Sequence, residues 1–141
     1  MKAALILVLF SSCAAGWNAV AYEPRALVGA DPRAQIEEII KSKPGCIAHV
    51  EWLSATLRVE AVCDRAEALQ YVAHFDRVAT VELKQHNKVS EWYLVTVTHQ
   101  NDASPPFYWQ PRNLAEAQRL VDALDALRAP GPSAKPAGTD I

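Results

Sequence analysis

Four histidines are the side chains of this 141-residue chain that could perform acid–base or metal chemistry: His49, His74, His86 and His99. Their spacing matches none of the H-x-H, H-x-x-x-H or H-E-x-x-H patterns that bring two imidazoles to one metal ion, so we expect no metal site. The chain also lacks the G-x-S-x-G context of hydrolase serines and the glycine-rich loops that bind nucleotides. The sequence therefore predicts a protein that needs no cofactor and is not an enzyme.

A catalytic site is the alternative if the fold brings distant residues together. His49 or His74 would then act in a cleft with Glu60 or Asp76, in the manner of a small hydrolase. The simpler interpretation of His49 and Glu60 is a cross-strand pair on an exposed sheet face. His74 is expected at the carboxyl end of a helix, where a basic side chain interacts favourably with the helix dipole.

Two cysteines, Cys46 and Cys63, flank segments in which apolar and polar residues alternate. Folded as a hairpin about Ser54-Ala55, these segments place four facing pairs, including the two cysteines, on one side and complementary polar pairs on the other. A shift of one residue destroys both sets, so this register is favoured and a Cys46–Cys63 disulfide bond is predicted. A four-residue loop over 53–56 is the alternative turn. The four facing pairs on the apolar side are Cys46–Cys63, Ala48–Ala61, Val50–Val59 and Trp52–Leu57. The polar pairs on the other side are His49–Glu60 and Glu51–Arg58.

Aromatic side chains are better candidates for a binding surface than the histidines. In the expected strands Trp92 points into the core and Tyr93 points outward. In the run 107–109, either Tyr108 alone or Phe107 together with Trp109 must face outward, because side chains alternate along a strand. An outward pair would form an apolar patch suited to a partner. The candidate partner-binding residues are therefore Tyr93, Phe107, Tyr108 and Trp109.

The start of the chain has the pattern of a secretory signal peptide. Lys2 supplies a positive charge, an apolar run follows from Ala3 to Phe10, and small residues lead to Ala19-Val20-Ala21. The apolar run is shorter than the roughly 20 residues that a membrane-spanning helix needs. We expect cleavage after Ala21, which would place the mature protein in a periplasm or outside the cell.

A second processing route begins at a different residue. The segment Phe10-Ser11-Ser12-Cys13-Ala14 resembles the lipobox of bacterial lipoproteins. That resemblance implies that residues 1–12 are the signal, that Cys13 is acylated, and that the protein is anchored to a membrane through the lipid.

The remaining sequence divides into a linker over 22–30, one domain over 31–128 and a disordered tail over 129–141 that is rich in proline, glycine and alanine. The full chain has 14 basic and 16 acidic residues. Removing residues 1–21 takes away Lys2 and no acid, which leaves 13 basic against 16 acidic residues and a net charge near −3. This balance argues against nucleic acid as a partner.

Local patterns predict helices at three places. Asp31-Pro32 begins the first, which carries three isoleucines on one face and ends at Pro44-Gly45. The spacing of Asp64 and Glu67 is that of a capping box and predicts a second helix. Asn113 begins the third, which has an apolar stripe at three- and four-residue spacing. The apolar helix positions are Ile36, Ile39 and Ile40, then Leu69, Val72 and Ala73, then Leu120, Val121, Leu124 and Leu127.

A second hairpin is expected over 78–98, with a turn at Asn87-Lys88 that pairs Leu83 with Trp92 and Val81 with Leu94, and a short strand over 107–109. The element order is then α-β-β-α-β-β-β-α. Both hairpins have one apolar face and each helix has one apolar stripe. The sequence therefore predicts an α+β domain in which helices pack on one face of a single antiparallel sheet of about five strands.

The functional hypothesis that fits these features is an exported, non-catalytic protein that binds another protein, in the manner of an inhibitor or immunity protein. The alternatives are a structural or assembly lipoprotein of the cell envelope and, third, the small hydrolase-like enzyme. The sequence leaves the identity of the partner and the oligomeric state open.

Overall fold

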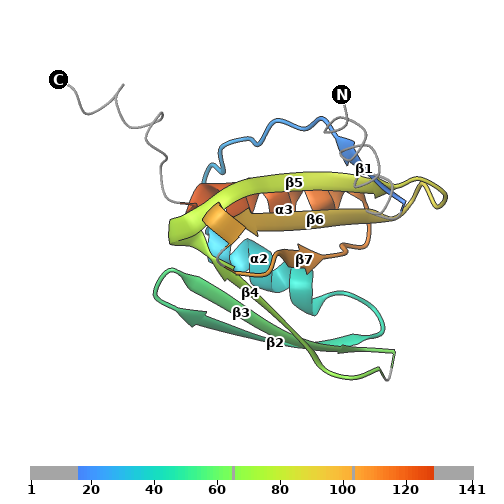
Figure 1. Cartoon of the computed structure of the whole chain (residues 1–141), viewed down its shortest axis with the longest axis horizontal. Coiled ribbons are helices and arrows are strands. Elements are labelled where there is room, and N and C mark those ends of the chain that lie inside the picture. The colour runs from blue at the N-terminus through green and yellow to red at the C-terminus, as the bar shows by residue number, and fades with distance from the viewer. Residues whose placement is uncertain (1–15, 65, 103, 129–141) are drawn as a thin grey trace.

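The structure is a computed structural model that describes residues 16–64, 66–102 and 104–128 (Figure 1). It is an α+β fold, as predicted, in which helices accompany antiparallel strands. In chain order the elements are β1 (Trp17–Val20), α2 (Pro32–Lys41), β2 (Cys46–Leu53), β3 (Thr56–Cys63), β4 (Leu69–His74), the 3-10 turn η1 (Phe75–Arg77), β5 (Val78–His86), β6 (Tyr93–His99), η2 (Gln100–Asp102), β7 (Phe107–Trp109) and α3 (Leu114–Leu127).

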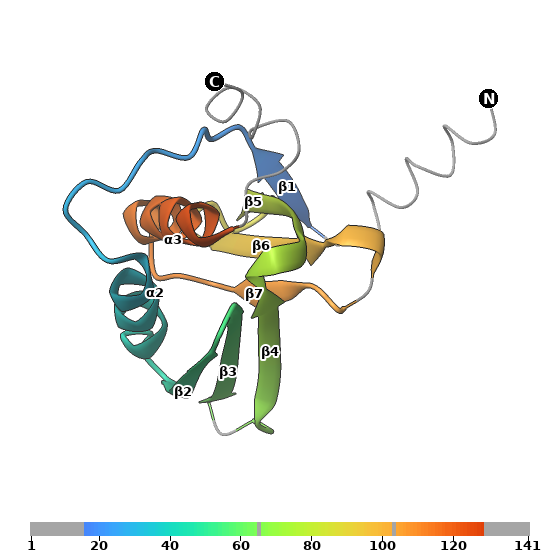
Figure 2. The same ribbon diagram turned by 90° about the vertical axis from the view of Figure 1, so that its left-hand side faces the viewer.

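The strands form two sheets, so the prediction of a single sheet of about five strands is wrong. The four-stranded sheet has the order β1-β5-β6-β7 and the three-stranded sheet has the order β2-β3-β4. The chain passes from one to the other through η1, which redirects the backbone between β4 and β5. Figure 2 shows the three-stranded sheet extending away from the other sheet on the side of β7.

The first hairpin follows the predicted register at every position. Ser54 and Ala55 form the turn, and Ser54 takes a left-handed backbone conformation with φ of 56°. The Sγ atoms of Cys46 and Cys63 lie 1.96 Å apart, which is the distance of a disulfide bond. The alternating pattern and the cysteine pair act together here, because both require the same register.

The second predicted helix is wrong: the described residues from Asp64 to His74 contain no helix, and Leu69–His74 form strand β4 instead. Asp64 has a φ of 52°, whereas a helix N-cap needs an extended backbone. Leu69, Tyr71 and Ala73 lie opposite the inward residues of β3 and complete the three-stranded sheet. Pairing with a buried central strand thus outweighs the local preference for a helix.

The second hairpin has a different register from the predicted one. Leu83 pairs with Val95 and not with Trp92, and Val81 pairs with Val97 and not with Leu94. The connection runs from residue 87 to residue 92, because His86 organises a longer loop. Its Nδ1 accepts the backbone N–H groups of Lys88 and Val89, both at 3.1 Å. This loop moves Trp92 out of the sheet and out of the core.

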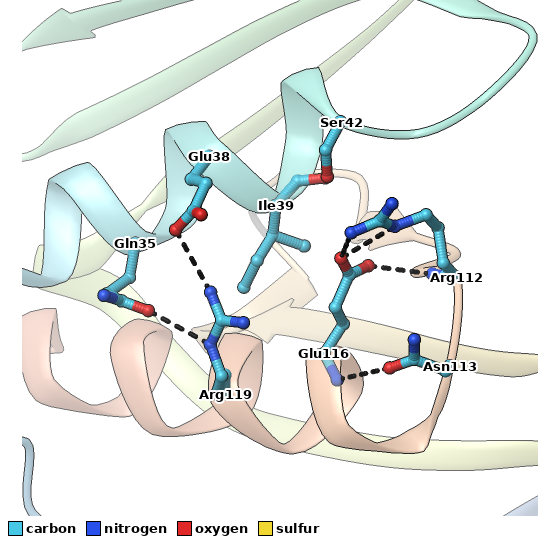
Figure 3. A network of polar contacts seen from close by, with 8 residues as sticks. All are labelled: Gln35, Glu38, Ile39, Ser42, Arg112, Asn113, Glu116 and Arg119. Atoms are coloured by element: carbon cyan, nitrogen blue, oxygen red, sulfur yellow. Dashed lines mark hydrogen bonds and ion pairs between the residues drawn. The ribbon is translucent and has the colours of Figure 1, made fainter.

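Both remaining helices begin where the sequence predicts. Asp31 caps α2 by accepting the Arg33 N–H, and Asn113 caps α3 by accepting the Glu116 N–H. Figure 3 shows the two helices side by side, where Arg119 of α3 donates hydrogen bonds to two polar side chains of α2. The buried faces of the helices join those of the strands in one core, formed by Ile36, Ile39, Ile40, Leu57, Val59, Ala61, Ala73, Phe75, Val78, Leu83, Val95, Val97, Phe107, Trp109, Ala117, Leu120, Val121, Ala123 and Leu124.

The N-terminal strand β1 lies within the predicted signal peptide, residues 1–21. It pairs with β5 from Trp17 opposite His86 to Val20 opposite Leu83, and Val20 packs against the core. Residues 1–15, the lipobox cysteine Cys13 and the predicted tail 129–141 lie outside the described residues. Cleavage after Ala21 would remove β1, whereas cleavage before Cys13 would keep it.

The predicted linker over 22–30 contains no helix or strand, but Tyr22 and Leu27 pack against the core and polar contacts hold it to α3. The hydroxyl of Tyr22 donates to the buried Asp122 carboxylate of α3 at 2.8 Å. The backbone N–H of Arg25 donates to the same oxygen, also at 2.8 Å. The segment is therefore tied to α3 and does not begin as a free tether.

Candidate binding groove

A groove of about 430 Å³ opens where the ends of the two sheets meet. Its walls come from the turn before β2, the end of β3, the middle of β4, the start of β6 and the second half of β7 with the residue that follows it. We call it the aromatic groove, after four of the residues that line it. The lining residues are Lys43, Cys63, Asp64, Tyr71, Trp92, Leu94, Tyr108, Trp109 and Gln110.

Strand alternation in β7 decides which rings reach the groove. Phe107 is completely buried and Trp109 is 4% exposed, whereas Tyr108 between them is 42% exposed. Trp92, at the end of the loop before β6, is 46% exposed. The groove thus has two projecting rings, Trp92 and Tyr108, beside a wall that belongs to the core.

Edge-to-face contacts hold that wall in place. The ring of Tyr71 on β4 lies 6.2 Å from that of Phe107 and 6.3 Å from that of Trp109, with interplanar angles of 76° and 86°. Such T-shaped pairs are the favoured geometry of aromatic side chains. They also connect the two sheets across the floor of the groove, so the wall is shaped before any partner arrives.

Lys43 is the basic side chain of the aromatic groove. Its Nζ donates to the backbone carbonyl of Gln110 at 2.6 Å, which ties the turn before β2 to the end of β7. Burial lowers the pKa of Lys43, although the charges of Asp64 and Glu116 act in the opposite direction. Lys43 is thus a half-buried basic side chain in the lining of the groove, with its Nζ fixed on a backbone carbonyl.

Trp109 adds a polar group that the described residues leave unpaired. Its indole N–H is buried and has no hydrogen-bond partner among them. Burying an unpaired donor costs about 1–3 kcal/mol.

Two of the four predicted partner-binding residues line the groove, and two do not. Tyr108 projects into the groove and Trp109 forms part of its wall. Phe107 faces the core, so the expectation that it offers a partner surface is wrong. Tyr93 is half-buried and its hydroxyl accepts from Gln85 Nε2 at 3.4 Å, outside the groove.

The sequence pattern predicts Trp92 in the core, whereas the structure places it in the lining of the groove. The error follows from the shortened turn, since the observed six-residue connection places Trp92 before the strand. Lys43, Asp64 and Tyr71 were also missed, because nothing in the sequence shows that three separate turns and strands meet at one place. The Pro44-Gly45 pair beside Lys43 predicts a turn, but it does not predict which strands lie next to that turn in space.

Two of the four histidines lie apart from the others, and two lie together. His49 is exposed opposite Glu60 on the outer face of the hairpin, as the sequence predicts. His86 organises the loop before β6. His74 and His99 lie together, with ring centroids 5.4 Å apart. No group of three histidine, cysteine, aspartate or glutamate side chains in the described part of the chain is arranged to hold a metal ion.

His74 also lines a second cleft of about 450 Å³, between the outer face of β3–β4 and the loop before β7. Its Nδ1 lies 3.2 Å from Thr56 Oγ1, and its backbone N–H donates to His99 Nε2 at 3.0 Å. Burial lowers the pKa of His99, and the neighbouring His74 lowers it further. Asp76, the carboxylate of the alternative catalytic site, is exposed and its Oδ1 lies 3.9 Å from Arg77 Nε. The further lining residues are Arg58, Gln70, Tyr71, Val72, Ser104, Pro105 and Pro106.

Comparisons with protein-family models, with curated proteins and with solved structures gave no match. Neither α2 nor α3 is long and apolar enough to cross a membrane, and the described residues contain no other α-helix. The paired cysteines are compatible with an oxidising compartment. The candidate site therefore rests on its own geometry.

Proposed function

We propose that this protein is exported, has no catalytic role and binds another protein through the aromatic groove. The observation that carries the proposal is the pair of exposed rings, Trp92 and Tyr108, beside a preformed aromatic wall. Tryptophan and tyrosine in partly enclosed surroundings are the residues that contribute most to protein–protein binding. A protein of the inhibitor or immunity type acts by such contacts alone.

The chemistry of the groove favours one kind of partner segment. An apolar side chain would enter between Trp92 and Tyr108, and a neighbouring carboxylate would approach Lys43 Nζ. Because the wall is fixed by the contacts of Tyr71, the groove loses little conformational freedom on binding.

The test is photo-crosslinking in the cells that make the protein. A photoreactive amino acid replaces Tyr108 in the full chain. In a matched control the same amino acid replaces Val28, which is 91% exposed and does not line the groove. We expect a discrete protein adduct from position 108 that is lost when Trp92→Ala is added. Equal adducts from both positions, or an adduct that persists in Trp92→Ala, would contradict the proposal.

A lipid-anchored envelope protein is a second candidate, and strand β1 is the observation that favours it. The strand is retained only if processing occurs before Trp17. Cleavage before Cys13 meets this condition and cleavage after Ala21 does not. The mass of the N-terminal peptide distinguishes the two routes.

A further inference from the structure

The outer edge of β2 is an unpaired strand edge. Strand β2 is terminal in the three-stranded sheet, and among the described residues β3 is its one strand partner (Figure 2). Two apolar side chains stand on its outer face, Ile47 at 80% exposure and Leu53 at 48%. A long, apolar edge strand is a template for pairing with another chain.

The hairpin register shows which backbone groups point away from β3. Asp64 N–H donates to Gly45 O at 2.7 Å, which extends the ladder by one pair and makes the odd-numbered residues of β2 those bonded to β3. The N–H and C=O groups of the even-numbered residues therefore point to the open edge. These residues are Cys46, Ala48, Val50 and Trp52; the N–H of Cys46 already donates to the carbonyl of Lys43 at 3.4 Å, which leaves Ala48, Val50 and Trp52 with both groups open.

The strand is complementary to a second copy of itself. In an antiparallel pair related by a two-fold axis at Val50, the open edge groups of Ala48, Val50 and Trp52 meet their equivalents. On the outer face, Ile47 then lies opposite Leu53 of the second copy. His49 lies opposite Glu51 of the second copy, so an imidazole N–H meets a carboxylate twice, once on each side of the axis.

Neighbouring registers lack this complementarity. Backbone directions allow shifts of the two-fold axis by one residue, to His49 or to Glu51. The first shift places two His49 side chains opposite each other, and the second places two Glu51 carboxylates opposite each other, which is destabilising. The register centred on Val50 also overlaps the strands almost completely, since β2 runs from Cys46 to Leu53.

We propose that two copies of this chain pair through β2, with Val50 on the two-fold axis, and form a continuous six-stranded sheet. The two copies of α2 lie on the same side of that sheet. Two side chains of α2 contact the edge residue Trp52: Glu37 accepts its indole N–H at 2.8 Å, and the Arg33 guanidinium lies 4.9 Å from its ring. The pairing uses neither Trp92 nor Tyr108 and is independent of binding at the aromatic groove.

The first test is the oligomeric state of the mature protein by analytical ultracentrifugation over a concentration series. One strand seam is a small interface, so we expect a dissociation constant of about micromolar order. Ile47→Lys removes the apolar pair without touching the core, and we expect it to weaken the dimer at least about tenfold. Val28→Lys is the matched control and should dimerise like the unmodified protein.

A second test reads the register directly. His49→Cys and Glu51→Cys variants are prepared separately and then mixed under mild oxidation. Non-hydrogen-bonded pairs have Cα atoms about 4.5 Å apart, within the range of a disulfide. We expect a 49–51 linked dimer, identified by peptide mapping, from the mixture and none from His49→Cys alone.

Three results would overturn the proposal. The first is a monomer up to about 100 μM, well above the expected micromolar dissociation constant. The second is a dimer that Ile47→Lys leaves intact. The third is a 49–49 linked dimer from His49→Cys alone, which would show a different register.

Discussion

At the residue scale, Glu116 shows how one buried charge is accommodated. The carboxylate accepts the backbone N–H of Arg112 at 3.0 Å and two hydrogen bonds from its guanidinium, while the Glu116 N–H donates to Asn113 Oδ1 (Figure 3). Burial raises the pKa of Glu116, but the hydrogen bonds and charge of Arg112, helped by Arg119, more than offset it. The pKa of Glu116 is therefore below its usual value.

This arrangement predicts a pH dependence of stability. Because the folded-state pKa of Glu116 is depressed, its contribution is present above the unfolded-state pKa and is lost as pH falls through the folded-state pKa. Glu116→Gln should lower the free energy of unfolding by about 1–3 kcal/mol at pH 7. Urea denaturation at a series of pH values measures the difference, which should shrink below about pH 4. A difference that stays constant down to pH 2 would contradict this role of Glu116.

The residues of the aromatic groove were the hardest to predict. Tyr108 was a candidate because strand parity left few choices, and the structure exposes it. The pattern predicts Trp92 in the core only if the hairpin turns over two residues, and the observed connection is longer. The cause of the longer loop is a side-chain contact, His86 Nδ1 with two backbone N–H groups, and no pattern of apolar residues reports such a contact.

At the element scale, a helix or strand could be predicted where its local sequence pattern and its packing against the rest of the fold favour the same structure. In the first hairpin the alternation, the cross-strand charges and the cysteines all select one register, and that register is observed. At Asp64–Glu67 the local capping pattern favours a helix. The following residues form β4 instead, because pairing with β3 completes the hydrogen bonding of that strand. Sequence alone does not show that competition.

The Cys46–Cys63 pair gives an element-scale prediction. Replacing both cysteines with serine removes the covalent bond between β2 and β3, two strands of 8 residues each. In the chain-entropy model this should lower the free energy of unfolding by about 3 kcal/mol, because the unfolded chain is no longer closed into a loop. Chemical denaturation with and without reductant measures this, since reductant should destabilise the unmodified protein and leave the double variant unchanged. Two free thiols in the denatured, unreduced protein would show that the bond is absent.

Strand β1 gives a second prediction at this scale. A chain that begins at Tyr22 lacks the four pairs with β5 and the packing of Val20. It should unfold at a lower temperature than a chain that begins at Cys13, because the edge of β5 is then open. Thermal unfolding of the two forms, with Cys13→Ser in the longer one, makes the comparison. Equal midpoints would show that β1 contributes nothing to the folded domain.

At the scale of the whole molecule, the two surfaces for which we propose partners lie in different places. The aromatic groove lies where the sheets meet, and the open edge of β2 lies at the far margin of the three-stranded sheet. The fold class could be predicted because the balance of helical and alternating patterns is local. The division into two sheets could not, because it follows from the turn at η1 and the pairing of β4.

The route of export makes a prediction for the intact protein purified from its own cells. A lipid-anchored form should have a mass that begins at Cys13 with added acyl chains, and a secreted form should begin at Tyr22. Mass spectrometry with and without reductant also detects the two hydrogens lost in the Cys46–Cys63 bond. A full-length chain that retains residues 1–12 would contradict both routes.

The central claim is that the aromatic groove binds a protein, and the affinity of the crosslinked partner tests it most directly. Isothermal titration calorimetry would compare the unmodified protein, Trp92→Ala and the control Val28→Ala. We predict that Trp92→Ala raises the dissociation constant at least about tenfold while Val28→Ala leaves it unchanged. A Trp92→Ala protein that binds within about twofold of the unmodified one, a change of less than half a kcal/mol, would contradict the account.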